Sequence, residues 1–492
     1  MPVHLNLMNH LTRRSFLKRS LATSAALSLP ARFWAQVPGA NDDLRVAVIG
    51  FNGQGKSHIH SLTGIKGVRI VALCDVDRTV LEREAKELEK EGKPIQTYTD
   101  VRKLLESKSI DAISTATPNH WHALISVWAC QAGKDVYVEK PVSHNVWEGR
   151  KIVEAARKYD RIVQGGTQSR SSGGLREAWA WMREGHIGKI KVARGLCYKR
   201  RESIGRAGGP VKVPESVDFD LWCGPAPKVA PVRKRLHYDW HWFWATGNGD
   251  LGNQGIHQMD VCRWALGKDG LSSRVLSIGG RFGYEDDGQT PNTQFAVHDF
   301  GDALLIFEVR GLPSRAHRPD GLGDEKTPTM DKYRGQDIGH VIECEGGYIA
   351  GIKAFDNDGK EMKKFSGAGE NHHSNWVKAV RSRKPSDLNA EILETHLSSA
   401  LCHTSNISYR LGRQSNPEEI KEALKSDIAA QETLARFEEH LARNNVDLKK
   451  IKATLGAFLK MDGKAERFVD NLKANELLTR EYRKGFVVPE RV

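Results

Sequence analysis

The stretch RVAVIGFNGQGKSHI, Arg45 to Ile59, decides the fold, and two descriptions fit it. Its spacing G-x-x-x-x-G-K-S is that of a P-loop, which would bind a nucleoside triphosphate through Gly50, Gly55, Lys56 and Ser57. Its succession of a strand, a glycine turn and a helix is equally the phosphate-binding start of a dinucleotide-binding fold. The second glycine of G-x-G-x-x-G is replaced by Asn52, a residue type that tolerates left-handed backbone angles. The stretch alone leaves both descriptions open.

The chain that follows continues as a βαβ unit. Leu44–Ile49 predicts a first strand, a short helix follows, and TGIKGVRIVALCD predicts a second strand that ends at Asp75. An acidic side chain at this strand tip accepts hydrogen bonds from the ribose of adenosine and repels a 2′-phosphate. In a P-loop protein the same strand would bind magnesium, so this strand does not decide between the two folds.

The next two predicted strands favour the dinucleotide-binding fold. The first is DAISTATP, Asp111 to Pro118, and the second ends in Glu139-Lys140-Pro141 after a helical stretch. Apolar strands that alternate with helices predict a parallel sheet. A lysine at the carboxyl edge of such a sheet, here Lys140, projects into the ligand crevice, where a triphosphatase has no use for it.

With these pieces in place, the chain resembles the glucose–fructose oxidoreductase, inositol dehydrogenase and rhizopine-catabolism family (Gfo/Idh/MocA). The resemblance rests on the order and spacing of AVIGFNGQG, LCDVD, TATPNHWH, VEKP and GNGDLGNQGIHQMD. It implies an α/β protein with an N-terminal Rossmann dinucleotide-binding domain, residues 43–165. A C-terminal α/β domain with an open, mostly antiparallel sheet would follow, residues 166–413. The resemblance also implies a homo-oligomer, a dimer or tetramer, because the outer face of that sheet is commonly buried against another subunit.

The resemblance implies NAD as the cofactor. NADP is the alternative, because Arg78, just beyond Asp75, can accept a phosphate. The predicted cofactor-binding residues lie in the glycine loop and at the ends of the later strands: Gly50, Asn52, Gly53, Gln54, Gly55, Asp75, Thr117, Asn119, His122 and Glu139. We expect Glu139 to contact the nicotinamide ribose or to pair with Lys140, and Asn119 has helix capping as its alternative role.

Hydride transfer from a sugar carbinol needs a cation beside the developing alkoxide and a base for the hydroxyl proton. The resemblance implies the first role for Lys140. In GNGDLGNQGIHQMD, a predicted helix carries Asn253, His257 and Asp260 at i, i+4 and i+7 on one face. His257 suits a base because an ordinary histidine has a pKa of about 6.5. The family usually has an aspartate where Asn253 stands, so Asp260 either replaces that charge or is structural.

The stretch LHYDWHWFW concentrates aromatic residues just before this predicted helix. Aromatic rings stack on the apolar faces of sugars, so we predict that His241 and Trp242 contact the substrate; the alternative is a corner of the core. Arg170 and Tyr198 are further substrate candidates. No metal site built from His237 and its neighbours is expected, since the resemblance carries no metal.

The N-terminus predicts export. TRRSFLKRS places Arg13 and Arg14 before a short apolar run, which is the pattern of a twin-arginine signal. We expect residues 1–35 to be this signal, recognised by the twin-arginine translocase, and the protein to be periplasmic or otherwise exported. The apolar run is too short to span a membrane. Since free NAD is scarce outside the cytoplasm and this route exports folded proteins, we expect a tightly bound cofactor and a redox-neutral cycle.

The function predicted from these features is an exported NAD(P)-dependent oxidoreductase that acts on a sugar, cyclitol or related polyol. The alternative is an NAD-dependent glycosidase or lyase that works through a transient keto-sugar. A binding protein that has lost turnover is a third class, for which Asn253 is the one hint. The formal charge of +13 includes five basic residues in the signal, and the others are interspersed with acids, so no nucleic-acid partner is predicted. The seven cysteines form no C-x-x-C pair and are expected to be buried thiols.

Residues 414–492 are predicted to form a helical C-terminal extension. Asn416, Pro417 and Glu419 suit the N-cap, the first position and the reciprocal cap of a helix. An apolar stripe follows, made by Ile420, Leu424, Ile428, Leu434 and Phe437. We expect the final segment to be docked on the protein through Tyr482 and the apolar residues around Phe486.

Overall fold

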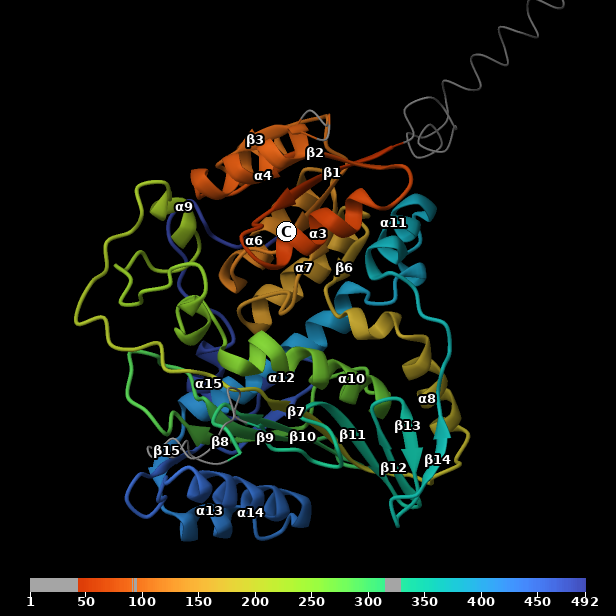
Figure 1. Cartoon of the computed structure of the whole chain (residues 1–492), viewed down its shortest axis with the longest axis vertical. Coiled ribbons are helices and arrows are strands. Elements are labelled where there is room, and N and C mark those ends of the chain that lie inside the picture. Colours follow the sequence, from red (N-terminus) through yellow and green to blue (C-terminus); the bar gives the residue numbers. More distant parts are fainter. Residues whose placement is uncertain (1–42, 91, 93–94, 315–328) are drawn as a thin grey trace, which may run out of the picture. The chain divides into compact units, whose positions relative to one another are not determined.

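The computed structural model describes residues 43–90, 92, 95–314 and 329–492, which form two sheets with helices packed around them (Figure 1). The predicted export signal, residues 1–35, lies outside the described residues. Among the residues described, no helix is long and apolar enough to cross a membrane.

The first sheet consists of parallel strands in the order β3-β2-β1-β4-β5-β6. The strands are β1 (Leu44–Ile49), β2 (Val68–Cys74), β3 (Gln96–Tyr98), β4 (Ala112–Thr115), β5 (Asp135–Val138) and β6 (Val163–Gly165). This is the strand order of the Rossmann dinucleotide-binding fold. Lys56, which a P-loop would direct at a phosphate, is exposed, and its Nζ lies 3.4 Å from Oε2 of Glu84. The P-loop description is therefore excluded.

Helices cover both faces of this sheet. They are α3 (Gln54–Thr63), α4 (Arg78–Lys90), α5 (Val101–Leu105), α6 (Asn119–Gln131) and α7 (Val146–Lys158). Because successive strand residues point to opposite faces, β1 sends Val46 and Val48 into one apolar core and Ala47 and Ile49 into another. A parallel sheet that is buried in this way presents its carboxyl edge as the place for a ligand.

The second sheet is mixed and mostly antiparallel. Its strands run in the order β14-β13-β12-β11-β7-β10-β9-β8-β16-β15, and only β10 and β7 pair in parallel. The bounds are β7 (Ile190–Tyr198), β8 (Arg274–Gly280), β9 (Thr293–Asp299), β10 (Leu304–Arg310), β11 (Ile338–Cys344), β12 (Gly347–Ala350), β13 (Lys353–Phe355), β14 (Glu361–Lys364), β15 (Arg413–Ser415) and β16 (Ala453–Leu455). The predicted fold class is confirmed in both domains.

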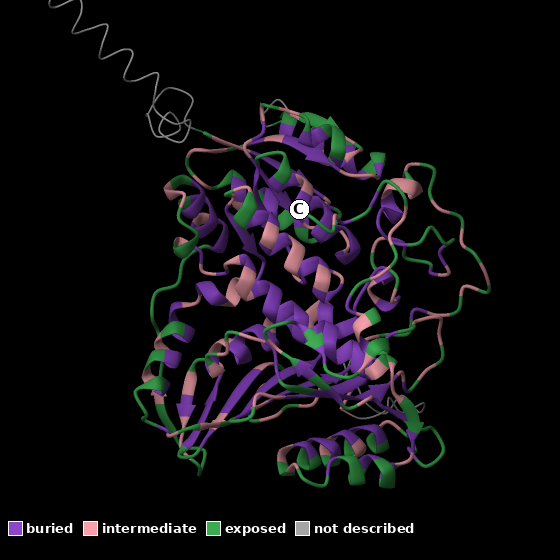
Figure 2. Cartoon of the chain, turned by 180° about the vertical axis from the view of Figure 1, so that it is seen from behind, coloured by how far each residue is buried: buried purple, intermediate pink, exposed green. Residues whose placement is uncertain are grey.

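Three helices lie on the inner face of the second sheet, toward the first domain (Figure 1). They are α8 (Gly173–Arg183), α10 (Ile256–Leu266) and α12 (Ile392–Arg410). α12 contacts both α7 of the first domain and β8 of the second. α10 and α12 are buried along almost their whole length (Figure 2), whereas α8 keeps one side exposed. The helix α11 (His372–Ser382) adds Trp376 to the core of the first domain.

The C-terminal extension is not purely helical, which corrects the prediction. The capping box of Asn416 and Glu419 is present, but it begins a short helix, α13 (Pro417–Ala423). A second helix, α14 (Ile428–Arg443), starts afresh because Asp427 caps it by accepting from the amide of Ala430. Further along, β16 and β17 (Leu459–Asp462) pair with β8, and β18 (Arg467–Phe468) and α15 (Leu472–Glu476) follow. The strands escaped prediction because they are only two to four residues long.

The extension covers part of the sheet and then returns to the first domain. α13 and α14 pack on the outer face of the second sheet, where Phe437 joins Ile278 and Phe295 in one core. This is the face that the predicted oligomer would use, and the chain covers part of it itself. Phe486 and Val488 are buried in the first domain near α6, and the hydroxyl of Tyr482 donates to Glu148 over 3.0 Å. The final segment is docked, as predicted.

Buried histidines make the fold sensitive to acid. Burial lowers the pKa of His298 and His403 to about 3 and that of His340 to about 4. In the unfolded chain each has a pKa of about 6.5. Below that pH the unfolded state therefore binds protons that the folded state refuses, and stability that is complete above pH 6.5 is lost as the pH falls toward 4.

We expect the midpoint temperature of thermal unfolding to decrease as the pH is lowered from 6.5 to 5. Ordinary carboxylates titrate below this range, so the buried histidines would cause the decrease. Differential scanning calorimetry at a series of pH values measures this directly. A midpoint that is constant between pH 7.5 and pH 5 would contradict it.

Candidate cofactor and active site

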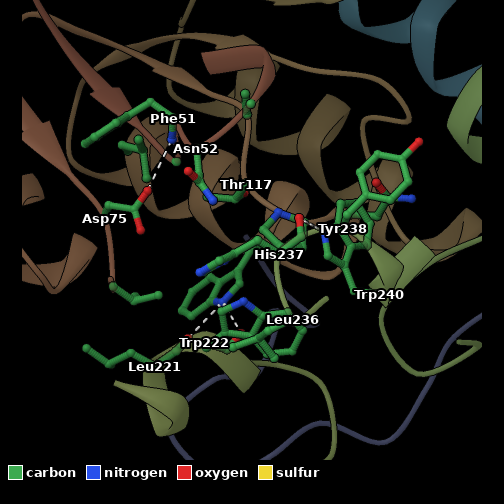
Figure 3. A pocket seen from close by; sticks show the side chains of 18 of the residues that line it. Phe51, Asn52, Asp75, Thr117, Leu221, Trp222, Leu236, His237, Tyr238 and Trp240 are labelled. Atoms are coloured by element: carbon green, nitrogen blue, oxygen red, sulfur yellow. Dashed lines mark hydrogen bonds between the residues drawn. The ribbon is translucent and has the colours of Figure 1, made fainter. Parts of the chain in front are cut away.

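A cavity of about 790 Å³ opens at the carboxyl edge of the first sheet. Its walls come from the glycine loop after β1, from the ends of β2, β4 and β5, and from a segment of the second domain, residues 211–241, which we call the strap. Figure 3 shows the two sides facing each other, with Asp75 and Asn52 on one side and His237, Tyr238 and Trp240 on the other. Ligands of open parallel sheets bind at this edge.

The glycine loop is shaped for close approach of a ligand to its backbone. Gly50 has a φ of +73°, and a Cβ there would lie 2.8 Å from Thr117. A Cβ on Gly55 would lie 2.1 Å from the carbonyl oxygen of Gly50. Nothing lies within 4 Å of the Cβ position of Gly53, at the start of α3. The loop thus leaves open space at a helix N-terminus, where phosphates bind. Asn52 and Gln54 line the same cavity and are exposed.

Asp75 is held at the tip of β2 by backbone donors. The amides of Phe51 and Asp77 donate to its two carboxylate oxygens over 3.2 and 3.0 Å. Burial raises its pKa above the ordinary value. Arg78, the residue that could have accepted a 2′-phosphate, instead donates from its guanidinium to the carbonyl of Glu215. At this strand tip the carboxylate of Asp75, and not the guanidinium of Arg78, is available to the cofactor, which agrees with the prediction of NAD.

The loop after β4 joins the two domains beneath the cavity. Asn119 does not cap α6; its side-chain amide donates to Asn248 of the second domain over 2.9 Å. The ring nitrogens of His122 lie 2.7 Å from the carbonyl oxygens of Thr117 and Pro141. Burial lowers the pKa of His122. Thr117, Asn119 and His122 all line the cavity.

Glu139 is buried and remains a carboxylate. It accepts from Gln168 and from the amide of Lys140, and it lies 3.1 Å from Nε2 of His58. Burial alone would raise the pKa of Glu139, but the His58 contact and the nearby cations hold it well below its ordinary value. The other ring nitrogen of His58 contacts Ser114 over 2.8 Å. Sequence reasoning missed His58, whose place in the middle of a helix gives no signal of this role.

Lys140 connects the two domains at the centre of the site. Its Nζ donates to the carbonyl oxygen of Asn253 over 2.7 Å. Burial lowers the pKa of Lys140, while Glu139 acts in the opposite direction. Asn253 lies in a π-helical turn, Leu251–Gly255, that precedes α10. The predicted α-helical spacing of Asn253 and His257 is therefore wrong at its first position, and the backbone carbonyl of Asn253 is the group that meets the lysine.

His257 follows at the start of α10 and is half-buried. Burial, helped by the Lys140 ammonium, lowers its pKa to about 4, whereas Glu139 and Asp260 act in the opposite direction. Within the described residues no hydrogen bond occupies either ring nitrogen of His257. The cavity lining includes Lys140 and Asn253 but not His257, which acts electrostatically on the same centre.

Two predicted substrate residues are committed elsewhere, and so is Asp260. Nε of Arg170 lies 2.9 Å from both carboxylate oxygens of Asp260, and both side chains are buried. Asp260 therefore has a structural role. Tyr198 donates to Glu308 over 2.9 Å in a network that includes Arg436 of α14, on the outer face of the sheet. Neither Arg170 nor Tyr198 lines the cavity, so the structure contradicts their predicted contact with a substrate there.

The aromatic stretch reaches the cavity through His241, one of the two residues predicted from it, and through two that were not predicted, Tyr238 and Trp240. His241 lines it and stacks on Trp240 with ring centres 3.6 Å apart. Burial lowers the pKa of His241 to about 3. Trp242 instead packs with Ile204 and Phe243, so its predicted substrate contact is wrong. Trp240 and Tyr238 line the cavity, as does Trp222 from α9 (Phe219–Cys223).

These features fit a dinucleotide cofactor. The loop offers open space at the N-terminus of α3, Asp75 presents a carboxylate at the strand tip, and Lys140 stands at the far end of the same cavity. Among the residues described, no group of three or more metal-ligating side chains converges. The fold and the site together define a nicotinamide-dinucleotide-binding protein with one ammonium group at the reacting end.

Two models of one protein family match parts of this chain. Residues 44–167 match the model of the Gfo/Idh/MocA oxidoreductase family, NAD-binding Rossmann fold. Residues 189–289 match the model of the C-terminal alpha/beta domain of the same family. The chain therefore resembles the Gfo/Idh/MocA oxidoreductases in both domains, and its first domain is an NAD-binding Rossmann domain.

Curated relatives match over about a third of this chain. Glycosyl hydrolase family 109 protein 2 of Shewanella sp. (strain ANA-3) is 32% identical in an alignment of 176 residues that covers 31% of this chain and 39% of that protein. The alpha-N-acetylgalactosaminidase of Shewanella oneidensis is 29% identical in an alignment of 174 residues that covers 31% of this chain and 38% of that protein. The match spans about two fifths of the length of these relatives.

Solved structures share the fold over most of the chain. An oxidoreductase from Agrobacterium radiobacter, solved with NAD+, L-tartaric acid and magnesium, has a TM-score of 0.53 at 16% identity and covers 74% of this chain and 95% of its own. The WlbA dehydrogenase from Bordetella pertussis, solved with NADH and UDP-GlcNAcA, has a TM-score of 0.54 at 16% identity and covers 75% and 97%. At these identities the likeness concerns the fold.

The glycine loop gives a matched pair of variants. In Gly55→Ala the new Cβ meets a backbone oxygen, so the loop must open, and we expect the Kd for NAD to rise at least about tenfold, which is 1.4 kcal/mol. Gly64→Ala, at the end of the same helix, has its nearest atom at 3.7 Å and an ordinary helical backbone, and it should bind NAD normally. Calorimetric titration measures both. Equal affinities would refute this account of the loop.

Proposed function

We propose that the chain is an exported NAD-dependent oxidoreductase that acts on a CH–OH group of a sugar, cyclitol or related polyol and keeps its cofactor through turnover. The observation that carries this proposal is the position of Lys140. Its ammonium lies at the carboxyl edge of the NAD-binding sheet, in the same cavity as the glycine loop and Asp75. A cation there can meet the oxygen of a carbinol whose hydrogen leaves as hydride.

NAD, when bound, supplies the hydride acceptor. The chain supplies the groups that handle oxygen and proton. Lys140 is oriented by its bond to the carbonyl of Asn253 and has further protons to donate to a substrate hydroxyl. As negative charge grows on that oxygen, the buried ammonium stabilises it more strongly than water would. The lowered pKa of Lys140 also eases transfer of its proton.

His257, which is coupled electrostatically to Lys140 although it does not line the cavity, is the candidate acceptor of the hydroxyl proton. With a pKa of about 4, its ring is neutral above that pH and carries a free lone pair. It is a weaker base than the ordinary histidine that the sequence predicted, and it returns the proton correspondingly easily. A proton that must be given back in each cycle suits such a base.

The strap supports retention of the cofactor. Its first half is tied to the tip of β2, where the amide of Asp218 donates to Val76 and the amide of Arg78 donates to Ser216, both over 2.9 Å. Nε2 of His237, in its second half, lies 2.9 Å from Asp77. The strap thus crosses the cavity beside Asp75, over the expected place of the adenosine ribose. A cofactor beneath it leaves only when these contacts break.

Export and a redox-neutral cycle complete the proposal. Arg13 and Arg14 support a twin-arginine signal in residues 1–35 and a location outside the cytoplasm. An enzyme there cannot exchange NAD with a pool in each turnover. One compound would be oxidised and another reduced in the same site, so the retained cofactor returns to its starting state.

A second candidate, an NAD-dependent glycosidase or lyase, is favoured by the two Shewanella relatives, one of which is named an alpha-N-acetylgalactosaminidase. In that reaction a ring hydroxyl is oxidised transiently, the bond to the leaving group breaks, and the carbonyl is reduced again. The roles of Lys140 and His257 are the same. Solvent deuterium at a substrate carbon together with release of a free sugar distinguishes this reaction from exchange between two sugars.

The retention proposal makes a measurable prediction. Purified protein should carry NAD through dialysis, and His237→Ala should lose it about tenfold faster, because a hydrogen bond to a carboxylate contributes about 1.5–3 kcal/mol. Lys228→Gln, on the strap but outside the cavity lining, should behave as the natural protein does. Mass spectrometry and absorbance follow the bound cofactor. Protein that holds no nicotinamide at all would refute retention.

The catalytic proposal rests on Lys140. Lys140→Met should keep its bound NAD but lower the sugar-dependent change in nicotinamide absorbance about 10²–10³-fold, the effect of removing one preorganised donor. Lys199→Met removes an exposed lysine whose charge also acts on Lys140, and its activity should stay near that of the natural protein. A panel of sugars and cyclitols provides the substrate. Unimpaired turnover in Lys140→Met would assign the catalytic role to a different group, and no turnover in the natural protein with any sugar would favour a binding protein.

A further inference from the structure

Arg233 is a buried cation that has no hydrogen-bond or ion-pair partner among the described residues. Its side chain is 6% exposed, it lines the cavity, and its Nε and Nη2 are both enclosed without a hydrogen-bond acceptor. Within the described part of the chain no carboxylate forms an ion pair with it; the nearby Asp239 is paired with Arg235 over 2.7 Å. Buried charges in proteins are almost always paired, because an unpaired charge loses its hydration without return. An arginine in this state indicates a missing anion.

The surroundings fix the guanidinium in place. It lies 4.8 Å from the ring centre of Trp222 and 5.5 Å from that of Phe243. These cation–π contacts stabilise the planar guanidinium, but they offer no hydrogen-bond acceptor to its N–H groups. Burial lowers the pKa of Arg233 to about 10, which leaves it charged at neutral pH.

A helix N-terminus faces the same cavity. α6 has thirteen residues, and its N-cap, Pro118, has no side-chain hydrogen bond to the first turn. Pro118, Asn119 and Trp121 line the cavity together with Arg233. The first amides of a helix lack internal partners and carry the positive end of its dipole. Two independent sources of positive potential therefore border one space.

Arg233 approaches the cavity from the strap of the second domain, whereas the glycine loop, Asp75, Glu139 and Lys140 belong to the first domain. The cofactor carries phosphates of its own, so the test below separates them from an anionic group of the substrate.

We propose that Arg233 and the first turn of α6 form an anion subsite that binds a carboxylate or phosphate group of the substrate. This deepens the proposed function, on which it rests: the polyol that this enzyme oxidises is an acidic one, such as a uronic acid or a sugar phosphate. A planar guanidinium offers a carboxylate or phosphate two parallel N–H donors, which suits the two unsatisfied nitrogens of Arg233.

The test uses full-length protein loaded with NAD. Inorganic phosphate, glucuronate and neutral glucose are titrated, and the fluorescence of the tryptophans, including Trp222 beside the site, reports binding. We expect phosphate and glucuronate to bind the natural protein, Arg233→Gln to weaken both at least about tenfold, and Arg233→Lys to recover part of the loss. Lys228→Gln, an equal change of charge on the same strap, should bind both as the natural protein does.

Three results would overturn the subsite. They are equal phosphate affinity in the natural protein and Arg233→Gln, an equal response to glucose and glucuronate, and loss of NAD from Arg233→Gln with unchanged phosphate binding, which would assign Arg233 to the cofactor. Thermal melts identify a variant that has not folded, and Arg233→Lys then carries the comparison. Phosphate binding needs no turnover, so the subsite can be confirmed even if Lys140→Met shows that the proposed oxidation is wrong.

Discussion

The contact between Nζ of Lys140 and the carbonyl oxygen of Asn253 joins the two domains at the point where the site must be assembled. Lys140 lies two residues after the end of the parallel strand β5, and Asn253 lies in a π-helical turn of the other domain. Turns of this kind recur at functional sites. An ammonium has three protons, and a buried one needs acceptors for them. The chain supplies one in its described part, so the site is built to be completed by a ligand oxygen.

Glu139 favours the charged form of Lys140 at this enclosed position. As the neighbour of Lys140 in the chain, it brings a negative charge to the same strand end, and His58, Gln168 and a backbone amide satisfy its oxygens. A buried carboxylate without such donors would cost several kcal/mol or become protonated. His58 can act here because β1, β4 and β5 are neighbours in the sheet, which sets α3 beside the end of β5.

The sequence predicts those parts of the site in which chain order and spatial order coincide. The glycine loop, Asp75 and Glu139-Lys140 stand at the ends of strands whose alternation with helices is plain, and the parallel sheet then brings them to one edge. The sequence does not indicate which aromatic residues of LHYDWHWFW reach the cavity. They lie in a short 3₁₀ turn, Asp239–Trp242, and the loop around it, where no helical or strand periodicity assigns side chains to a face. The placing of Asn253 fails for a related reason, since a π-helical turn breaks the 3.6-residue spacing. The sequence gives no sign of Arg233, because what distinguishes it is its burial without a hydrogen-bond or ion-pair partner, which only the structure shows.

The last residues of the chain carry a consequence for how the protein matures. Phe486 and Val488 fill the core of the domain that is synthesised first, and Tyr482 reaches its buried Glu148. That domain therefore emerges with an open apolar seam, which closes only after the second domain has been made. Folding of the nucleotide domain is thus coupled to synthesis of the segment that carries Phe486 and Val488. A quality check that senses exposed apolar surface would detect an unfinished molecule at this seam.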